Sequence, residues 1–232
     1  MALAVFLVLV GVYGVTAPGH TDSSDAEGYL QQARSLLRGE HGIEITGENQ
    51  RITPWRPGRD GVPAAIGGIG YPAAMTPLVA VGGLLGRAVP EEHADVVERL
   101  LAGFTNGLIT AMCAAALALA ARRLGAPLGG AALLGLGYGL GTYAWAHAGG
   151  FFSEPFTALL LMLAVLSALR GREVRAALHA GLAGLAAGGS ALARPSALLF
   201  VPIIGAYVVW TGLCRGRARG ALLGGVAFAA GA

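Results

Sequence analysis

The chain has 232 residues, of which 55% are hydrophobic and only 12% are charged, and its formal net charge is +3. Soluble domains carry about 25% charged residues, so this composition excludes an ordinary soluble domain. The positive charge comes from arginine alone, because the sequence contains no lysine, and it is too small for the basic surface of a nucleic-acid-binding protein.

Apolar runs of about 20 residues recur along the chain, and a helix of this length crosses the hydrocarbon core of a bilayer. We therefore expect an all-α fold, a polytopic transmembrane helical bundle that forms a single module over residues 1–232. The 38 glycines agree with this expectation, because small residues let membrane helices approach closely. Cys113 and Cys214 have neither the spacing of a disulfide framework nor that of a metal site.

The first predicted element is a membrane helix over the apolar residues 1–15. A cleaved signal peptide is the alternative, because Val15-Thr16-Ala17 resembles a cleavage site. Signal peptides carry basic residues before the apolar run, and this chain has none there. The membrane helix is therefore the preferred interpretation.

Residues 17–63 form the long polar region of the chain, which we interpret as a first external loop. Ser24-Asp25-Ala26-Glu27 fits a capping box, so a helix is expected to begin at Asp25. Its apolar side chains fall on one face, which predicts an amphipathic helix lying at the membrane interface. The glycines, prolines and mixed charges of residues 39–62 predict an irregular loop.

The segment 63–86 is apolar but is interrupted by Pro72 and Pro77. It fits either a spanning helix or a re-entrant or juxtamembrane pair of helices, because proline interrupts helices. The clearer spans follow an acidic connector at residues 91–95. We expect them at residues 99–121, 127–147, 152–169, 177–193 and 195–213, with a further one from about residue 220.

Arginine clusters predict how these spans are oriented. They occur at residues 122–123, 170–175 and 215–219, two spans apart, so they share one side, which should be the cytoplasm. The connectors 147–154 and 193–196 then lie on the outer face. If residues 63–86 do not cross, the first loop lies there too. Its length and the prolines favour this topology, whereas its five arginines favour the crossing alternative.

On the preferred topology, scarce ionisable residues meet on the outer face. A carboxylate there would take the proton of an attacking hydroxyl, and a guanidinium would neutralise a departing phosphate. The residues concerned are Asp25, Glu27, His147, Glu154 and Arg194. Each has a simpler alternative: the two acids of the first loop cap a helix, Glu154 lies in a favourable first turn, and Arg194 reaches lipid headgroups. His147 and Asn106 fit polar residues of helix packing.

Several motifs resemble those of the GT-C-fold glycosyltransferases, the lipid-carrier-dependent, protein-mannosyltransferase-like enzymes of glycosyltransferase family 39 type. The motifs are Asp25-x-x-x-Tyr29-Leu30, Ala33 to Gly39, Gly70-Tyr71-Pro72, Asn106 to Ala111, Ala121 to Gly125, Gly137 to Thr142, Phe152 to Phe156 and Ala193-Arg194-Pro195. Adjacent acids are common in the first loop of this family, whereas Ala26 separates the two acids here. Family members are longer, and this chain stops within an apolar segment, so the resemblance implies the N-terminal portion of a larger enzyme.

The resemblance also implies an activity and a location. A sugar would be transferred with inversion from a polyprenyl phosphate to an acceptor hydroxyl on the extracytoplasmic face of the cell membrane. Asp25 would be the catalytic base and Glu27 the second acid, while Arg194 would bind the lipid phosphate. Glu154, Tyr29, Tyr71 and His147 would contact donor or acceptor. No cofactor is evident, and a divalent cation stays open because family members differ in this respect. Membrane lipids are the other expected partners, and the sequence gives no oligomeric state.

Two other functions stay open at this point. A transporter or flippase-like bundle would explain a segment broken by proline and glycine, such as residues 63–86. Such a protein should show inverted repeats and polar residues near the bilayer midplane, and neither is evident in the sequence. In a non-catalytic assembly subunit, the Asp25 region would only be a capped helix.

Overall fold

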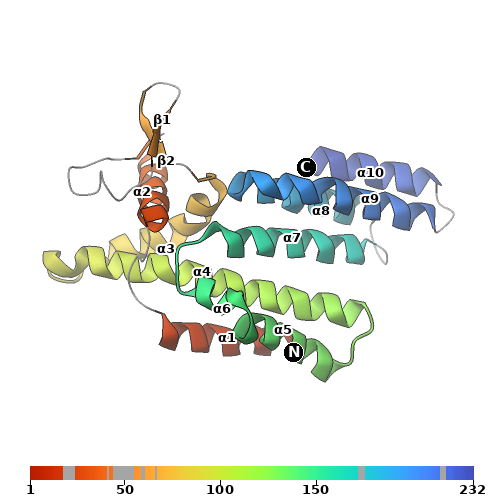
Figure 1. The fold of residues 1–232 in the computed structure, drawn as a ribbon, viewed down its shortest axis with the longest axis horizontal. Helices are drawn as coiled ribbons and strands as arrows, with labels where there is room; N and C mark the ends of the chain where they lie inside the picture. Colours follow the sequence, from red (N-terminus) through yellow and green to blue (C-terminus); the bar gives the residue numbers. More distant parts are fainter. Residues whose placement is uncertain are drawn as a thin grey trace.

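Helices make up most of the chain in the computed structural model, which describes residues 1–17, 24–40, 42–43, 55–58, 61–65, 67–171, 176–214 and 218–232. Within these ranges there are ten α-helices, one 3-10 helix and two short strands (Figure 1). They are α1 (Ala2–Thr16), α2 (Ser24–Arg38), β1 (Trp55–Pro57), β2 (Pro63–Ala65), α3 (Gly70–Gly86), α4 (Glu91–Arg123), α5 (Leu128–Gly141), α6 (Tyr143–Ala148), α7 (Ser153–Arg170), α8 (Ala176–Ala193), η1 (Pro195–Leu199), α9 (Phe200–Leu213) and α10 (Ala218–Gly231).

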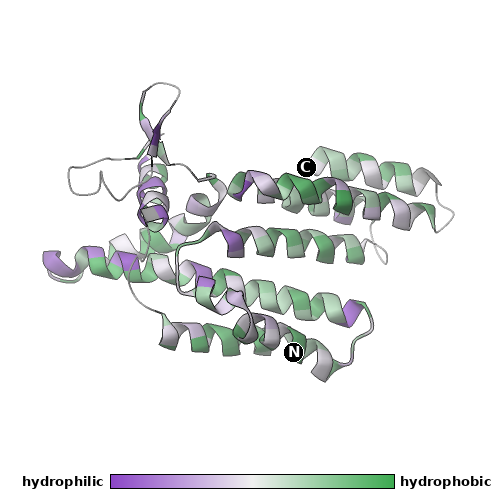
Figure 2. Cartoon of the chain, viewed as in Figure 1, coloured by the Kyte–Doolittle hydropathy of each residue, from purple (hydrophilic) through white to green (hydrophobic). Residues whose placement is uncertain are grey.

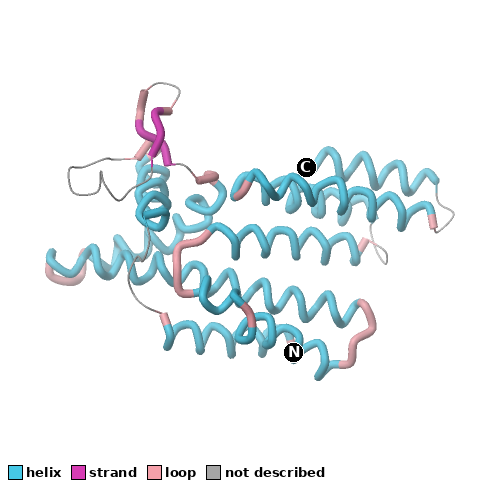
Figure 3. Tube along the Cα trace, in the orientation of Figure 1, coloured by secondary structure: helices cyan, strands magenta, loops and turns pink. Residues whose placement is uncertain are grey.

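Four helical stretches are long and apolar enough to cross a membrane. They are α4, α7, α8 and the run from η1 through α9. The expected all-α architecture with several membrane-type helices is confirmed at this level. Helices α1 and α5 and residues 220–231 of α10 are also apolar but shorter. Figure 3 shows the bundle helices running nearly parallel to one another, with connecting loops at the two ends.

The structure departs from the predicted elements in three places. The acidic connector expected at residues 91–95 is helical and forms the start of α4, which begins at Glu91. The expected span 127–147 is divided at Thr142, which has an extended backbone and separates α5 from α6. The Thr142 hydroxyl donates to the Tyr138 carbonyl at 2.7 Å and accepts from the Ala144 N–H at 3.1 Å, so it satisfies both helix ends. Part of the predicted irregular loop is an antiparallel hairpin, in which Trp55 pairs with Ala65.

The two ends of the bundle differ in polarity. Figure 1 places α2, the hairpin, the start of α7 and the end of α8 at one end, where Figure 2 shows many hydrophilic residues. The last turns of α4 and α7 lie at the opposite end and carry Arg122, Arg123 and Arg170. The arginines at 172, 175, 215 and 217 lie outside the described residues. The described arginine clusters are therefore separated from α2 by the length of the bundle.

Helix α3 does not run through the bundle. It lies antiparallel to the first half of α4, with Gly82 against Glu98 and Gly86 against Ala94, and its start meets the end of α8 (Figure 1). The 33 residues of α4 extend about 50 Å at 1.5 Å per residue, whereas the hydrocarbon core is about 30 Å thick. The first turns of α4 thus project beyond the other helices together with α3. Helix α3 therefore lies outside the set of helices that run the length of the bundle.

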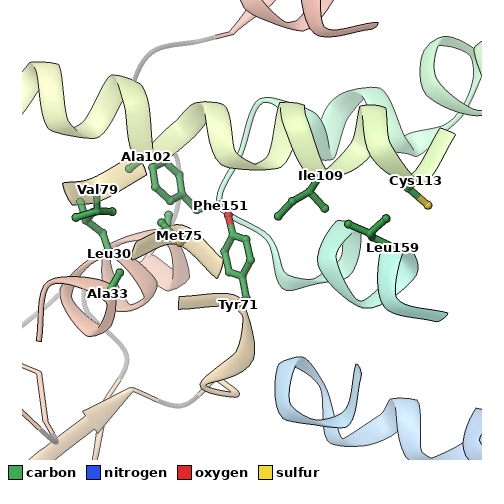
Figure 4. Packing of buried hydrophobic residues seen from close by; sticks show 11 residues of the cluster. Leu30, Ala33, Tyr71, Met75, Val79, Ala102, Ile109, Cys113, Phe151 and Leu159 are labelled. Atoms are coloured by element: carbon green, nitrogen blue, oxygen red, sulfur yellow. The ribbon is translucent and has the colours of Figure 1, made fainter. Parts of the chain in front are cut away.

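A buried apolar cluster attaches α2 to this projection. Figure 4 shows that α2, α3, α4 and the segment around the start of α7 all contribute side chains to it. Burial of each of the larger apolar side chains stabilises the packed state by about 1.5–3 kcal/mol. The labelled members are Leu30, Ala33, Tyr71, Met75, Val79, Ala102, Ile109, Cys113, Phe151 and Leu159. The amphipathic face predicted for the helix after Ser24 therefore packs on protein.

Candidate functional site

An ion pair joins two segments that the sequence analysis assigned to one face. Glu154 lies in the first turn of α7, and Arg194 is the extended residue between α8 and η1. The Arg194 guanidinium contacts the Glu154 carboxylate, and each side chain is 42% exposed. Exposed ion pairs contribute only about 0–1 kcal/mol, so this pair is weakly held and open to exchange with another anion.

Close backbone packing brings α3 to the same place. A Cβ on Gly68 would lie 2.2 Å from the Leu192 carbonyl oxygen, and one on Gly70 would lie 2.8 Å from the Ala193 nitrogen. Real Cβ atoms do not approach backbone this closely, so only glycine fits at these positions. The glycine-rich segment before α3 is therefore seated against the residues that precede Arg194.

Two tyrosines connect α2 to this segment. The Tyr29 and Tyr71 rings meet edge to face, with centroids 5.1 Å apart. Tyr71 is fully buried, and its hydroxyl has no hydrogen-bond partner among the described residues; Figure 4 shows it pointing toward the Phe151 side. Burial raises the pKa of the Tyr71 phenol, and the neighbouring Tyr29 and Glu154 raise it further. Tyr71 is thus a neutral phenol whose hydroxyl is a hydrogen-bond donor.

Asn106 of α4 fixes the segment that leads into Glu154. Its side chain is fully buried, and its amide nitrogen donates to the carbonyl oxygens of Gly150 at 2.6 Å and Phe152 at 2.9 Å. His147 of α6 packs its ring against Phe152, with centroids 4.8 Å apart, and against Tyr143 at 5.1 Å. Both polar residues therefore contact the 149–152 segment, and Asn106 has the packing role that the sequence indicated.

The two acids of the first loop have different surroundings. Asp25 is exposed in the first turn of α2. The Glu27 side chain is only 8% exposed and accepts from the Arg99 guanidinium at 2.6 Å and from the Gln31 amide at 2.8 Å. Burial alone would raise the pKa of Glu27, but these hydrogen bonds and the charge of Arg99 lower it below the ordinary value. Asp25 is therefore open to a substrate, whereas Glu27 is held by protein groups.

Glu27 belongs to a five-residue ion-pair cluster between α2 and α4, which the sequence analysis did not identify. Arg34 contacts both Asp95 and Glu98 at 2.6 Å, and Arg99 contacts Asp95 at 2.5 Å as well as Glu27. The cluster carries three negative and two positive charges. The acidic residues 91–95 and the arginines near them in the sequence indicated that ion pairs would form. Which residues pair is seen only once α2 is packed on α4.

The described residues contain no group of three or more His, Cys, Asp or Glu side chains arranged to hold a metal ion. The carboxylates of Glu27, Asp95, Glu98 and Glu154 all contact arginine instead. Among the groups that the sequence singled out, the described residues thus offer an exposed carboxylate on Asp25, a half-exposed guanidinium on Arg194 and a buried phenol on Tyr71.

No protein-family model, curated protein or solved structure matches the chain. Within the described structure, four residues selected from separate segments of the sequence belong to one connected region. They are Tyr29, Tyr71, Glu154 and Arg194, and the region is joined by the packing of Gly70 against Ala193. Asp25 lies one turn before Tyr29 on α2, and His147 reaches the region through Phe152.

Proposed function

We propose that the protein is the membrane portion of a GT-C-like glycosyltransferase. It transfers a sugar from a polyprenyl phosphate to an acceptor hydroxyl on the extracytoplasmic face of the membrane. The observation that carries this proposal is the Glu154–Arg194 pair, which lies at the bundle end that also holds α2 and its exposed Asp25. A half-exposed guanidinium beside a membrane helix end is suited to a lipid phosphate, because arginine binds phosphate in a bidentate manner.

The reaction is a single displacement at the anomeric carbon. Asp25 accepts the proton of the acceptor hydroxyl, whose oxygen forms the new bond to the anomeric carbon from the face opposite the phosphate. The bond between that carbon and the phosphate oxygen breaks, and its electron pair leaves with the phosphate. Arg194 neutralises the charge that develops on the leaving group. The result is inversion at the anomeric carbon.

Two residues take supporting roles in this proposal. Glu154 already occupies Arg194, so an incoming phosphate replaces this carboxylate and frees it for the acceptor or for the Tyr71 hydroxyl. Glu27 is held by Arg99 and Gln31, so we assign it to positioning α2 and leave proton transfer to Asp25 alone. The loss of a general base slows a reaction by about 10²–10⁴-fold, which sets the scale for the Asp25 test.

The test is transfer from a radiolabelled polyprenyl-phosphate sugar by the full-length protein in membranes. Asp25→Asn is expected to lower the rate at least about 100-fold, because the amide cannot accept the hydroxyl proton. Glu40→Gln is the matched control, since Glu40 is an exposed acid just beyond the other end of α2 and is paired with Arg38. Unchanged transfer by Asp25→Asn would remove this residue from the mechanism.

A second experiment tests the face of the membrane on which the site lies. A cysteine in place of Trp55, which is exposed in β1, is expected to react with an impermeant thiol reagent added to intact cells. The native Cys214 at the end of α9 is the internal control, because it should react only after permeabilisation. Protection of the cysteine at position 55 in intact cells would contradict the proposed topology.

A transporter or flippase-like bundle is the second candidate, and the break at Thr142 favours it, since transporters use discontinuous helices. Transporter sites lie near the bilayer midplane, whereas Glu154 and Arg194 lie at helix ends. This contrast favours the transferase. Movement of a polyprenyl-phosphate sugar across vesicles without any transfer to an acceptor would support the second candidate.

A further inference from the structure

A cavity of about 600 Å³ lies outside the region around Glu154 and Arg194. Its walls come from three segments: the end of α1, the junction of α5 with α6, and residues 149–152. Ligand sites in proteins commonly enclose about 300–1,000 Å³, so the cavity is large enough for a bound molecule. None of the eight residues that form its walls is charged.

The hydrogen-bonding side chains of the cavity wall already have partners. The Tyr13 hydroxyl donates to the Gly139 carbonyl at 2.8 Å. The Thr16 hydroxyl donates to the Val12 carbonyl at 2.9 Å and accepts from the Trp145 indole at 3.4 Å. Thr142 is used at both helix ends, as described above. The wall therefore offers a ligand mainly carbon atoms and aromatic faces.

This pattern decides the chemical class of the ligand. A saccharide or a headgroup would place hydroxyl or charged groups against a wall whose polar side chains are already paired, and unpaired polar groups are unfavourable in such surroundings. A hydrocarbon chain makes no hydrogen bonds with water, so it gives up none when it binds to this wall. The cavity is open to the surface of the protein, since Trp145 in its wall is 42% exposed, and the chain neighbours of its wall include exposed apolar side chains, Val15 next to Thr16 and Tyr143 next to Thr142. In a bilayer, lipid tails are the molecules that reach such a surface.

We propose that this cavity binds one acyl chain of a bilayer phospholipid. The amphipathic Trp145 and Tyr143 rings next to the cavity fit the boundary between tails and headgroups, where Trp and Tyr are enriched. The acyl chain packs against Gly150 and Phe152, whose carbonyls accept hydrogen bonds from Asn106. The bound lipid thereby supports the segment that leads into α7, whatever reaction the protein performs.

The test uses tryptophan fluorescence of the detergent-purified full chain. Replacing Trp55 and Trp210 by phenylalanine leaves Trp145, in the cavity wall, as the reporter. Phosphatidylcholine with brominated acyl chains, which quench tryptophan on contact, is titrated into the delipidated protein. Quenching of Trp145 is expected to saturate at about one lipid per chain, as a single site of this size requires. A matched variant that keeps only Trp210, which is 65% exposed on α9, should show quenching that rises without saturation.

Two further measurements make the outcome decisive. Ala146→Phe fills the cavity and is expected to weaken the saturable phase about tenfold, whereas Leu133→Phe, on the exposed surface of α5, should leave it unchanged. Unlabelled phosphatidylcholine should reverse the quenching. Trp145 quenching that does not saturate, or that survives Ala146→Phe, would overturn the proposal. Reversal by a polyprenyl phosphate but not by phosphatidylcholine would also overturn it, because the occupant would then be an isoprenoid chain.

Discussion

Arg99→Met should release α2 from α4. Arg99 joins the nearly buried Glu27 of α2 to Asp95, and its own side chain is 24% exposed. Removing one partner of a buried ion pair costs about 3–5 kcal/mol, because the other charge is left buried and unpaired. Asp95 is 56% exposed and loses little, so we expect about 2–3 kcal/mol against α2 docking. That free energy corresponds to a roughly 30- to 150-fold rise in the population of the undocked helix.

Thiol labelling measures this population. Ala33→Cys places a cysteine on the fully buried face of α2, in a chain whose native cysteines are replaced by alanine. When opening is fast relative to labelling, the rate reports the open fraction, so Arg99→Met should raise it roughly 30- to 150-fold. Arg38→Met, which breaks an exposed pair on the same helix, is the control and should change the rate less than about twofold.

A double variant separates the charge effect from lost packing. Glu27→Gln combined with Arg99→Met removes both charges of the buried pair, so it should restore part of the protection that Arg99→Met alone removes. If Arg99→Met labels no faster than the control, the cluster does not hold α2. If the double variant is more open than the single one, an unpaired Glu27 charge is not the cause.

Three further predictions concern other contacts. Gly68→Ala should lower Tm by roughly 4–8 °C, because its Cβ would meet α8 backbone at 2.2 Å, whereas Gly137→Ala, with open space around it, should not. Asn106→Ala removes the partner of one buried and one part-buried carbonyl, so residues 149–152 should lose about 2–3 kcal/mol of protection against hydrogen exchange. The lowered pKa of Glu27 contributes stability at pH values above the ordinary glutamate value of 4.5. Docking of α2 should weaken as the pH falls below this value, and Glu27→Gln should reduce the dependence, both measured by thiol labelling. The dependence that remains comes from Asp95, whose pKa is also lowered and which pairs with Arg34 of α2.

The sequence predicted those elements whose signals are local. The capping motif located the start of α2 to within one residue, and apolar length located α7 and α8 closely. The alternation of spans correctly placed Glu154 and Arg194 at the same end of the bundle. The start of one helix and the end of the next antiparallel helix must lie side by side, and here these are the start of α7 and the end of α8. These inferences needed only the length and direction of each helix.

Features that depend on docking were not predictable in this way. The ion pairs from Arg34 and Glu27 to α4 join residues 61 to 72 positions apart, so no local pattern contains them. The break at Thr142 lies in a glycine-rich apolar run, where hydropathy stays high and only the side-chain hydrogen bonds of Thr142 mark the change of direction. The roles of Asp25, Glu27 and the other selected residues in catalysis stay predictions.

The unbroken course of α4 has a consequence for how this end of the protein is built. A single helix runs from the acidic first turns to the terminal arginines, so the length of α4 fixes the distance between α2 and the arginine end of the bundle. Each residue of a helix advances it by 1.5 Å and turns it by about 100°. Adding or removing one residue within α4 would therefore rotate α2 about the α4 axis as well as move it along that axis. Evolution can alter the reach of this end only in steps close to whole helical turns.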